Sequence, residues 1–312
     1  TYKRATWVAS KSNQDTYWRI IRTNEDGGLR LLYVGPNPET KMGYIGQAQY
    51  NNTGDTIQNT DSMYVGYMYG TISDKRTNTN SSTIKEYLEN WYKNNLFAKY
   101  DKYISKTAIY CNDRSSTYVS GNGSTYSSST RLNILSPSYR CGDTGFGTLV
   151  EEFQAINDKF SVSKASGGNG QLTYPIALIT ADEIAFAGGR NQKYDENDAS
   201  LNFNNKLYYY ANSNGGSVIG ASKSWWTMSP NHDGASYSSP YHIPTLKLVG
   251  GYQITQYTGT YYGALYTGYS YGVGLVRPVI SLKSCVKFKN GNGTSGNPYE
   301  ITIDDACAKA EN

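Results

Sequence analysis

Two short motifs, WWTMSP at residues 225–230 and GVGLVRPVISL at residues 272–282, frame the stretch of sequence that decides the fold. Between them, nine tyrosines fall within the 35 residues from Tyr237 to Tyr271, among Ser, Gly, Thr and Asn. Tyrosine is stiff and amphipathic, which suits it both to recognition surfaces and to packing across neighbouring strands. The stretch therefore predicts a rigid frame at both ends and, between them, either a contact face or a packed aromatic layer.

The overall composition excludes several classes of protein. The net charge of +4 is the balance of 29 basic and 25 acidic residues, and no run of Lys and Arg exceeds two residues. We therefore expect no nucleic-acid partner. The mean hydropathy is −0.60, and no apolar run reaches about 18 residues, so no transmembrane segment is expected. Thr1 opens a polar, aromatic segment without a signal-peptide pattern, so any export signal or anchor would lie outside this sequence.

The cysteine spacing suits two loop-closing disulfides, Cys111–Cys141 and Cys285–Cys307. Each would contribute roughly 3 kcal/mol in the chain-entropy model, and together they predict an oxidising location. Four buried thiols in a cytosolic protein are the alternative. There is no C-x-x-C pair and only two histidines could join the cysteines, so we expect no metal site of this type.

Hydrophobic periodicity and turn signals predict short strands with interspersed helices. Residues 17–23 and 29–35 flank an Asp-Gly turn and predict a β-hairpin. Thr83 and Glu86 form a capping box for a helix over 83–99, whose apolar face comprises Ile84, Tyr87, Leu88, Trp91 and Leu96. A second capping box, Thr180 with Glu183, predicts a short helix that ends at Gly188. A third helix is predicted over 148–162 from its helical spacing.

Strands are predicted at 64–70, 106–115, 172–180 and 276–284, and a second hairpin follows residue 285. Pro278 cannot donate to a ladder, so it should stand at an edge or bulge. The Ser/Tyr/Gly-rich residues 115–129 should form an exposed loop. This order of elements predicts an α+β fold with one large domain, 1–284, and a disulfide-stapled C-terminal β-hairpin extension, 285–312.

The motifs at 225–230 and 272–282 resemble the C-terminal half of C-type-lectin-like domains. More closely, they resemble bacterial and phage surface proteins allied to the formylglycine-generating-enzyme fold. Upstream motifs share that resemblance, which covers most of residues 17–301: YWRIIR (17–22), YVGYMYG (64–70), STIKEYLENWYKNNL (82–96), CNDRS (111–115) and LTYPIALITADEIAFAGG (172–189). The resemblance implies a C-type-lectin-like core of short antiparallel strands with two or three helices and long loops. Residues 283–312 depart from it, because they continue past the expected last strand.

Some proteins of this fold are the variable proteins of diversity-generating retroelements, whose ligand-facing residues are rewritten by adenine-directed mutagenesis. Residues 231–271 resemble such a variable region in composition. The resemblance implies a scaffold of Trp225, Trp226, Ser229, Pro230, Arg277 and Pro278, with Arg277 tying the last strand to the display loop. The implied ligand-binding residues are Asn231, His232, Asp233, Tyr237, Tyr241, His242, Tyr257, Tyr261, Tyr262, Tyr266 and Tyr269.

Catalytic chemistry finds little support in the sequence. His232 and Asp233 are adjacent, and adjacent side chains rarely face each other. Cys285 and Cys307 are too far apart to match the copper-binding cysteines of formylglycine-generating enzymes. The acidic segment 195–200 (DENDAS) could gather oxygen ligands for Ca²⁺, although a solvated loop is the favoured interpretation, and no other cofactor is expected.

We therefore expect a binding protein and not an enzyme. It would act outside the cell, on a bacterial surface or a phage particle, and bind a macromolecular protein or glycan through its Tyr-rich face in adhesion or receptor recognition. The alternative is a structural subunit of a pilus-like or other surface filament, with the same tyrosines buried between copies. A homo-oligomer is compatible with either role.

Overall fold

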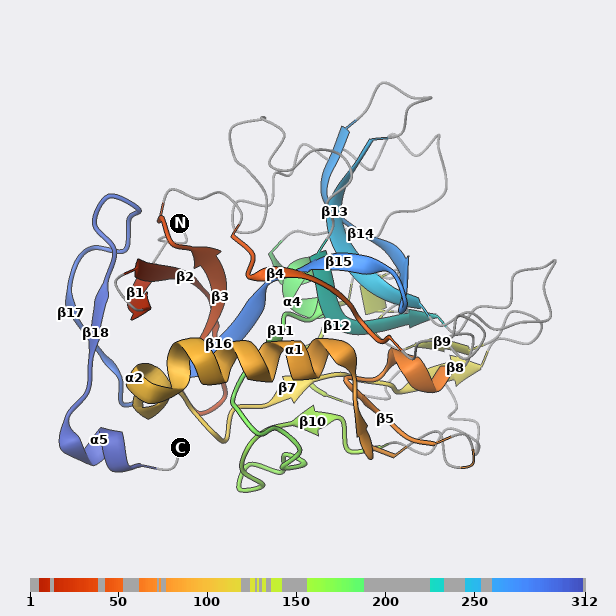
Figure 1. Cartoon of the computed structure of the whole chain (residues 1–312), viewed down its shortest axis with the longest axis horizontal. Helices are drawn as coiled ribbons and strands as arrows, with labels where there is room; N and C mark the ends of the chain where they lie inside the picture. The colour runs from red at the N-terminus through yellow and green to blue at the C-terminus, as the bar shows by residue number, and fades with distance from the viewer. Residues whose placement is uncertain are drawn as a thin grey trace.

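The computed structural model shows a mixed α+β protein with few helices and several small antiparallel sheets (Figure 1). Among the described residues no helix is long and apolar enough to cross a bilayer. The structure describes residues 6–11, 14–38, 43–52, 62–71, 73, 77–118, 124–126, 128, 131–132, 136–141, 156–187, 225–232, 245–253 and 260–310.

One five-stranded sheet contains the predicted N-terminal hairpin. Its order is β1 (Thr6–Lys11), β2 (Gln14–Thr23), β3 (Leu29–Gly35), β16 (Pro278–Leu282) and β11 (Ala177–Leu178), and all neighbours are antiparallel. The β2–β3 turn uses Gly27 at φ 81°, a left-handed conformation that glycine adopts without steric cost. The first and last parts of the chain thus share one sheet, with β16 against β3.

The second sheet contains the stretch between the two framing motifs. Its order is β14 (Thr260–Tyr269), β13 (Thr245–Gln253), β12 (Trp225–His232), β15 (Val273–Val276) and β4 (Gly46–Gln49). The hairpin β8 (Ser116–Tyr118) and β9 (Ser124–Tyr126) joins it through β12. A bond of 2.8 Å from the Met228 amide to the Ile179 carbonyl links β12 to the segment after β11, so the two sheets are held together.

The long helix forms where it is predicted, at residues 83–99, with one correction at its start. It runs as α1 (Thr83–Tyr92), a π-helical turn η3 (Lys93–Phe97) and α2 (Ala98–Tyr100), and its face packs against the core through Ile84, Tyr87, Leu88, Trp91 and Leu96. The predicted Thr83–Glu86 capping box is wrong, because Ser82 is the N-cap and accepts a bond from the Lys85 amide. Thr83 instead accepts from the Asn52 amide.

The shorter helix α4 (Ala181–Phe186) has the predicted capping box. The Thr180 hydroxyl accepts from the Glu183 amide, and the Glu183 carboxylate accepts from the Thr180 amide. The described residues also include the 3-10 turns η2 (Ser62–Val65) and η4 (Asp101–Tyr103) and the C-terminal helix α5 (Asp305–Lys309).

Several predicted elements differ from the structure. Residues 64–70 form η2 and then β5 (Met68–Tyr69), which pairs with β6 (Asn80–Ser81). The predicted helix 148–162 is wrong in its described part, since Lys159–Phe160 form strand β10 against β7 (Tyr110–Cys111). The predicted strand 172–180 shortens to β11, and 276–284 divides at Arg277 between β15 and β16. In each case partners elsewhere in the chain override local periodicity.

The predicted exposed loop 115–129 is also wrong in its described part. Its residues contribute the β8–β9 hairpin, and Tyr126 is only 1% exposed. The Ser128 hydroxyl is buried and donates to the Pro230 carbonyl at 2.8 Å. Pairing to β12 therefore converts a Ser- and Gly-rich segment into part of the sheet that carries the first framing motif.

The C-terminal residues form the predicted hairpin, β17 (Lys287–Asn290) with β18 (Glu300–Thr302), followed by α5. The Cys285–Cys307 disulfide fastens α5 to the end of β16. The buried Lys283 ammonium donates to the carbonyls of Cys307, Ala308 and Ala310, which are among the last acceptors of α5. In Figure 1 this extension lies on one side of the molecule, beside β1 and β2.

Candidate functional site

The first framing motif is buried in the core. Trp225 and Trp226 on β12 are each 1% exposed. The Trp226 indole donates to the Ala48 carbonyl at 2.9 Å and meets the Tyr50 ring edge-on, with the ring centroids 5.6 Å apart. Gly274 of β15 approaches this indole so closely that an added Cβ would stand 2.8 Å from its nitrogen. The two motifs are therefore in direct contact.

The second motif contributes a fully buried arginine. The Arg277 guanidinium lies over the Trp225 ring, 4.6 Å from its centroid, and donates to the Tyr33 carbonyl at 3.1 Å. It thereby joins β12 to β3 and not to a loop. Pro278 begins β16 opposite Leu178, at the short strand β11. Ser229 accepts from the Ala181 amide at 2.9 Å, which fixes β12 against the start of α4, and Pro230 is buried beside it.

The Tyr-rich segment between the motifs contributes a long antiparallel hairpin, β13–β14. Its register pairs Tyr261 with Tyr252, Tyr266 with Leu248, and Tyr269 with Thr245, and Tyr262 follows Tyr261 in β14. In Figure 1 the hairpin extends away from the body on the side opposite α1, and β14 is the last strand in the described order of its sheet.

The remaining predicted ligand-binding residues fall at the start of this segment or outside the described residues. Asn231 is 7% exposed at the end of β12, so it is buried with the framework. His232 pairs through its backbone with Thr245 and Thr125. Asp233, Tyr237, Tyr241, His242 and Tyr257 lie outside the described residues, as does the acidic segment 195–200 proposed for Ca²⁺. Within the described ranges no group of His, Cys, Asp or Glu could hold a metal ion.

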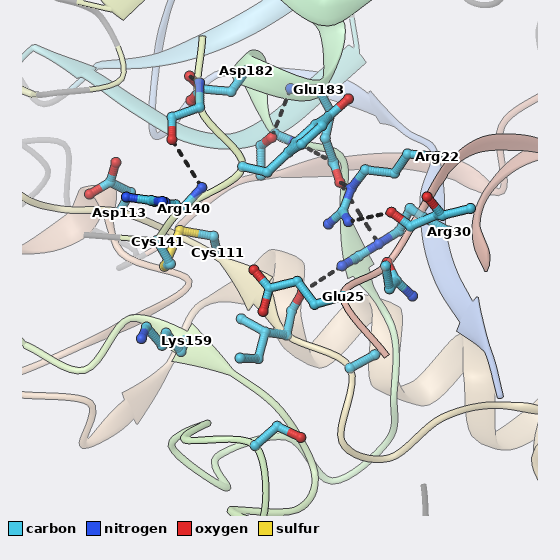
Figure 2. A pocket seen from close by; sticks show the side chains of 18 of the residues that line it. Arg22, Glu25, Arg30, Cys111, Asp113, Arg140, Cys141, Lys159, Asp182 and Glu183 are labelled. Carbon is cyan, nitrogen blue, oxygen red and sulfur yellow. Dashed lines mark hydrogen bonds and ion pairs between the residues drawn. A yellow bond between two sulfur atoms is a disulfide. The ribbon is translucent and has the colours of Figure 1, made fainter. Parts of the chain in front are cut away.

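A polar cavity of about 660 Å³ opens beside the first disulfide, Cys111–Cys141 (Figure 2). Both predicted disulfides are present, the first with a Cα–Cα distance of 5.4 Å and the second with 5.7 Å. In Figure 2, Arg22, Arg30 and Glu183 stand on one side of the space, and Asp113, Arg140 and the disulfide on the other, with Glu25 and Lys159 below. The cavity size lies in the range of small-molecule sites.

A buried ion cluster forms one wall of this cavity. The Arg131 guanidinium donates to Asp182 at 2.8 Å and to Asp113 at 2.7 Å, and all three side chains are less than 5% exposed. Burial raises the pKa of Asp113, although the charge of Arg131 opposes that effect. Ser115 also donates to Asp113, which has a φ of 50° in the left-handed region. The cluster joins three segments that are far apart in sequence.

A second cluster forms the opposite wall. Arg22 donates to Glu183 at 2.7 Å, and the Arg30 guanidinium lies 3.8 Å from the same carboxylate. Burial disfavours the ionised form of Glu183, but the charges of Arg30 and Arg22 outweigh it and lower the pKa of that carboxyl. Burial and the nearby charge of Arg22 lower the pKa of Arg30. Glu183 thus serves as helix cap and counterion at once.

The sequence alone does not reveal this cavity. Its local patterns indicate Glu183 only as a capping residue, and Cys111 and Cys141 only as a disulfide. The clusters depend on pairs 51 and 161 residues apart, Arg131 with Asp182 and Arg22 with Glu183. No local spacing pattern signals such contacts, and the one available hint was an unusual density of charged residues around residues 22–30 and 111–115.

Comparison with known proteins does not assign the chain to a family. No protein-family model, no curated protein and no solved structure matches it.

Proposed function

We propose that the chain is an exported, surface-displayed binding protein that presents its Tyr-, Ser- and Asn-rich segment, residues 231–271, to a macromolecular ligand. The role would be adhesion or receptor recognition at a bacterial surface or on a phage particle. The proposal includes a C-type-lectin-like core, on the strength of the motif resemblance, and diversification of the segment by a retroelement. Two disulfides support a location in an oxidising environment.

One observation carries the proposal: a buried frame holds the base of an extended tyrosine-bearing hairpin. Trp225, Trp226 and Arg277 are at most 1% exposed, and β13 pairs with β12 at both tryptophans. The β13–β14 hairpin carries tyrosines at five strand positions, 252, 261, 262, 266 and 269. A pre-organised base lowers the conformational entropy that a contact surface loses on binding. Tyrosine adds large contact area with few torsions to fix.

Sequence variation among sibling genes of related strains tests this proposal. We expect substitutions to concentrate between residues 231 and 271, whereas Trp225, Trp226, Gly274 and Arg277 stay unchanged because they pack against one another. Variation spread evenly over the chain, or concentrated in the frame, would contradict a diversified display segment.

A direct binding test complements the comparison of sibling genes. The purified chain would be applied to arrays of purified glycans and extracellular matrix proteins, together with Tyr266→Ser and the matched control Tyr299→Ser. Tyr299 is half-buried on the C-terminal hairpin, far in sequence from the segment. We expect Tyr266→Ser to weaken binding and Tyr299→Ser to leave it unchanged. Equal binding by both variants on every array would contradict the proposed face.

A filament subunit is the second candidate, favoured by the terminal position of β14 in its sheet. An open strand edge can pair with another chain. Light scattering after size exclusion over a wide concentration range distinguishes the two roles. Concentration-dependent assembly that Tyr266→Ser abolishes would favour the filament, and a persistent monomer would contradict it.

A further inference from the structure

Asparagine followed by glycine is a chemically labile pair, and the described residues contain it at positions 169–170, 290–291 and 292–293. Glycine has no Cβ, so its backbone nitrogen can approach the side-chain carbonyl carbon of the preceding asparagine without steric hindrance. That approach starts deamidation, a covalent change that needs only water. Since the dipeptide is the same at each position, its surroundings in the fold decide which asparagine reacts.

The first dipeptide of the C-terminal hairpin has an unengaged glycine amide. Asn290 is the last residue of β17, and both it and Gly291 are exposed. The Gly291 amide donates no hydrogen bond to any described residue. The Asn290 side chain donates from Nδ2 to the Glu300 carboxylate at 2.7 Å. At this position the attacking nitrogen therefore has no hydrogen bond within the described residues to give up.

The second dipeptide of the same turn is held at both ends. The Asn292 Oδ1 atom accepts from the Thr294 amide at 3.1 Å and from the Thr294 hydroxyl at 2.8 Å, which fixes the side chain in an Asx turn. Gly293 is buried, and its amide donates to the Asn297 carbonyl at 3.1 Å. Attack by this nitrogen requires the loss of that bond as well as of its proton, so Asn292 should react more slowly than Asn290.

The dipeptide after β10 is restrained in the same way. The Asn169 Oδ1 atom accepts from the Gln171 amide at 3.0 Å, and its Nδ2 donates to the Asn157 carbonyl at 3.0 Å. The Gly170 amide donates to the Ser161 hydroxyl at 3.4 Å. Of the dipeptides in the described ranges, only that at position 290 thus combines an exposed asparagine with an unengaged glycine amide.

We propose that Asn290 is a site of spontaneous deamidation in the folded protein. The Gly291 nitrogen gives its proton to solvent and attacks Cγ of Asn290, which forms a new C–N bond. The bond from Cγ to Nδ2 then breaks, Nδ2 takes up a proton from solvent and leaves as ammonia, and a cyclic succinimide remains. Water adds to one of the succinimide carbonyl carbons and breaks a ring C–N bond, which leaves an aspartate or an isoaspartate. The net change is the gain of one water and the loss of one ammonia.

The new carboxylate would weaken the hairpin, because Asn290 lies opposite Glu300 in the β17–β18 register. The reaction replaces the Nδ2 donor by an oxygen anion, and like charges directly opposite each other destabilise a strand pair. β17 is exposed at every position and pairs only with β18 among the described strands, so it has little packing to offset the repulsion. The site lies outside residues 231–271, so it stands or fails independently of the proposed function.

Incubation of the purified chain in heavy-oxygen water, in a mildly alkaline buffer at physiological temperature, tests the reactivity. Peptide mapping by mass spectrometry follows the uptake of labelled oxygen at Asn169, Asn290 and Asn292. We expect Asn290 to react at least severalfold faster than the other two. The matched control is the same chain, reduced and unfolded in guanidinium, in which the three sites should react at similar rates. A folded chain in which Asn290 reacts no faster than Asn292 or Asn169 would overturn the proposal.

Variants that imitate the product test its effect on the hairpin. Asn290→Asp should speed hydrogen exchange of the β17 and β18 amides severalfold, and adding Glu300→Gln should restore slow exchange, because the pair of like charges is then removed. Asn292→Asp is the matched control, since it adds the same charge but keeps the oxygens that accept from Thr294. Equal exchange in Asn290→Asp and the unaltered chain, or an equal increase in Asn292→Asp, would contradict the assigned role of Glu300.

Discussion

The interior of this protein has two regions built on opposite principles. Around α1, the Tyr33 ring packs edge-to-face against Trp18 and against Trp91, and Leu88 belongs to the same apolar core. Around the cavity, Arg131, Asp113 and Asp182 are buried with equally low exposure. A truncation in the apolar region costs the lost contacts and the cavity that it leaves, in proportion to the volume removed. Removal of one ion from the charged region costs more than its own contacts, because its partners stay buried without a counterion.

The largest effect expected from this comparison is the removal of Arg131. Arg131→Leu should reduce the free energy of unfolding by about 4 kcal/mol, since Asp113 and Asp182 would stay buried without their cation. Urea denaturation measures the change. The matched control is Lys287→Leu, which removes an ion pair exposed on both sides and should change stability by less than about 1 kcal/mol. Equal effects in both variants would remove the distinction between buried and exposed pairs.

The two disulfides differ in their surroundings, because only Cys111–Cys141 borders the charged region. They close loops of 30 and 22 residues, so replacing either cysteine pair by serine should cost about 3 kcal/mol. Loss of the Cys111–Cys141 bridge should also loosen the cavity wall, since both cysteines line the cavity. Loss of the Cys285–Cys307 bridge should leave that wall intact. Thermal unfolding measures the loss of stability, and hydrogen exchange of residues 111–115 compares the wall in the two variants; equal exchange there would be inconsistent with a wall that the first disulfide fastens.

In the apolar region, the free energy of unfolding should depend on side-chain volume and not on charge. Gly274→Ala should cost about 2 kcal/mol, because the new Cβ would stand 2.8 Å from the Trp226 indole nitrogen, and that ring is held by Tyr50 and Ala48. Denaturant unfolding measures the loss. Gly296→Ala is the control, since nothing lies within 4 Å of its added Cβ. If the two alanine variants are equally stable, the close contact between the framing motifs is not present.

The smallest expected effect is a pH dependence in the charged region. The pKa of Glu183 is lowered in the fold, so its stabilising contribution is present above its ordinary value of 4.5 and is lost as the pH falls through the folded pKa. Glu183→Gln should therefore reduce stability by about 1.5 kcal/mol at neutral pH, and the difference from the unaltered chain should shrink below pH 4.5. Asp113 is present in both the unaltered chain and Glu183→Gln, so its contribution to the pH dependence cancels in the difference between their free energies of unfolding. Urea titrations at several pH values make the measurement, and a constant difference would be contrary to this assignment.

What the sequence predicts well is local. Turn chemistry predicted the β2–β3 hairpin, helical spacing predicted the buried face of α1, and the Thr180–Glu183 box predicted α4. These features depend on residues within a few positions of one another. The α+β class and both disulfide pairs also follow from element order and cysteine spacing.

What it misses depends on partners distant in sequence. Lys159–Phe160 pair with β7, and residues 116–118 pair with residues 124–126, which in turn pair with β12. Neither segment carries a strong strand pattern. The cavity arises the same way, since Arg131 meets Asp182 only after β12 and α4 have packed. The contact between the Arg277 guanidinium and the Trp225 ring likewise could not be predicted from the sequence, although both residues belong to the framing motifs.

Hydroxyl-radical footprinting with mass spectrometry tests most directly whether a rigid frame presents these tyrosines to solvent. The chain supplies its own standards, because Tyr50, Tyr67, Tyr92 and Tyr110 are at most 1% exposed. We expect Tyr237, Tyr241, Tyr257, Tyr262 and Tyr266 to be oxidised much faster than those four. Oxidation of the segment as slow as that of the buried standards, in a chain shown to be monomeric, would contradict it.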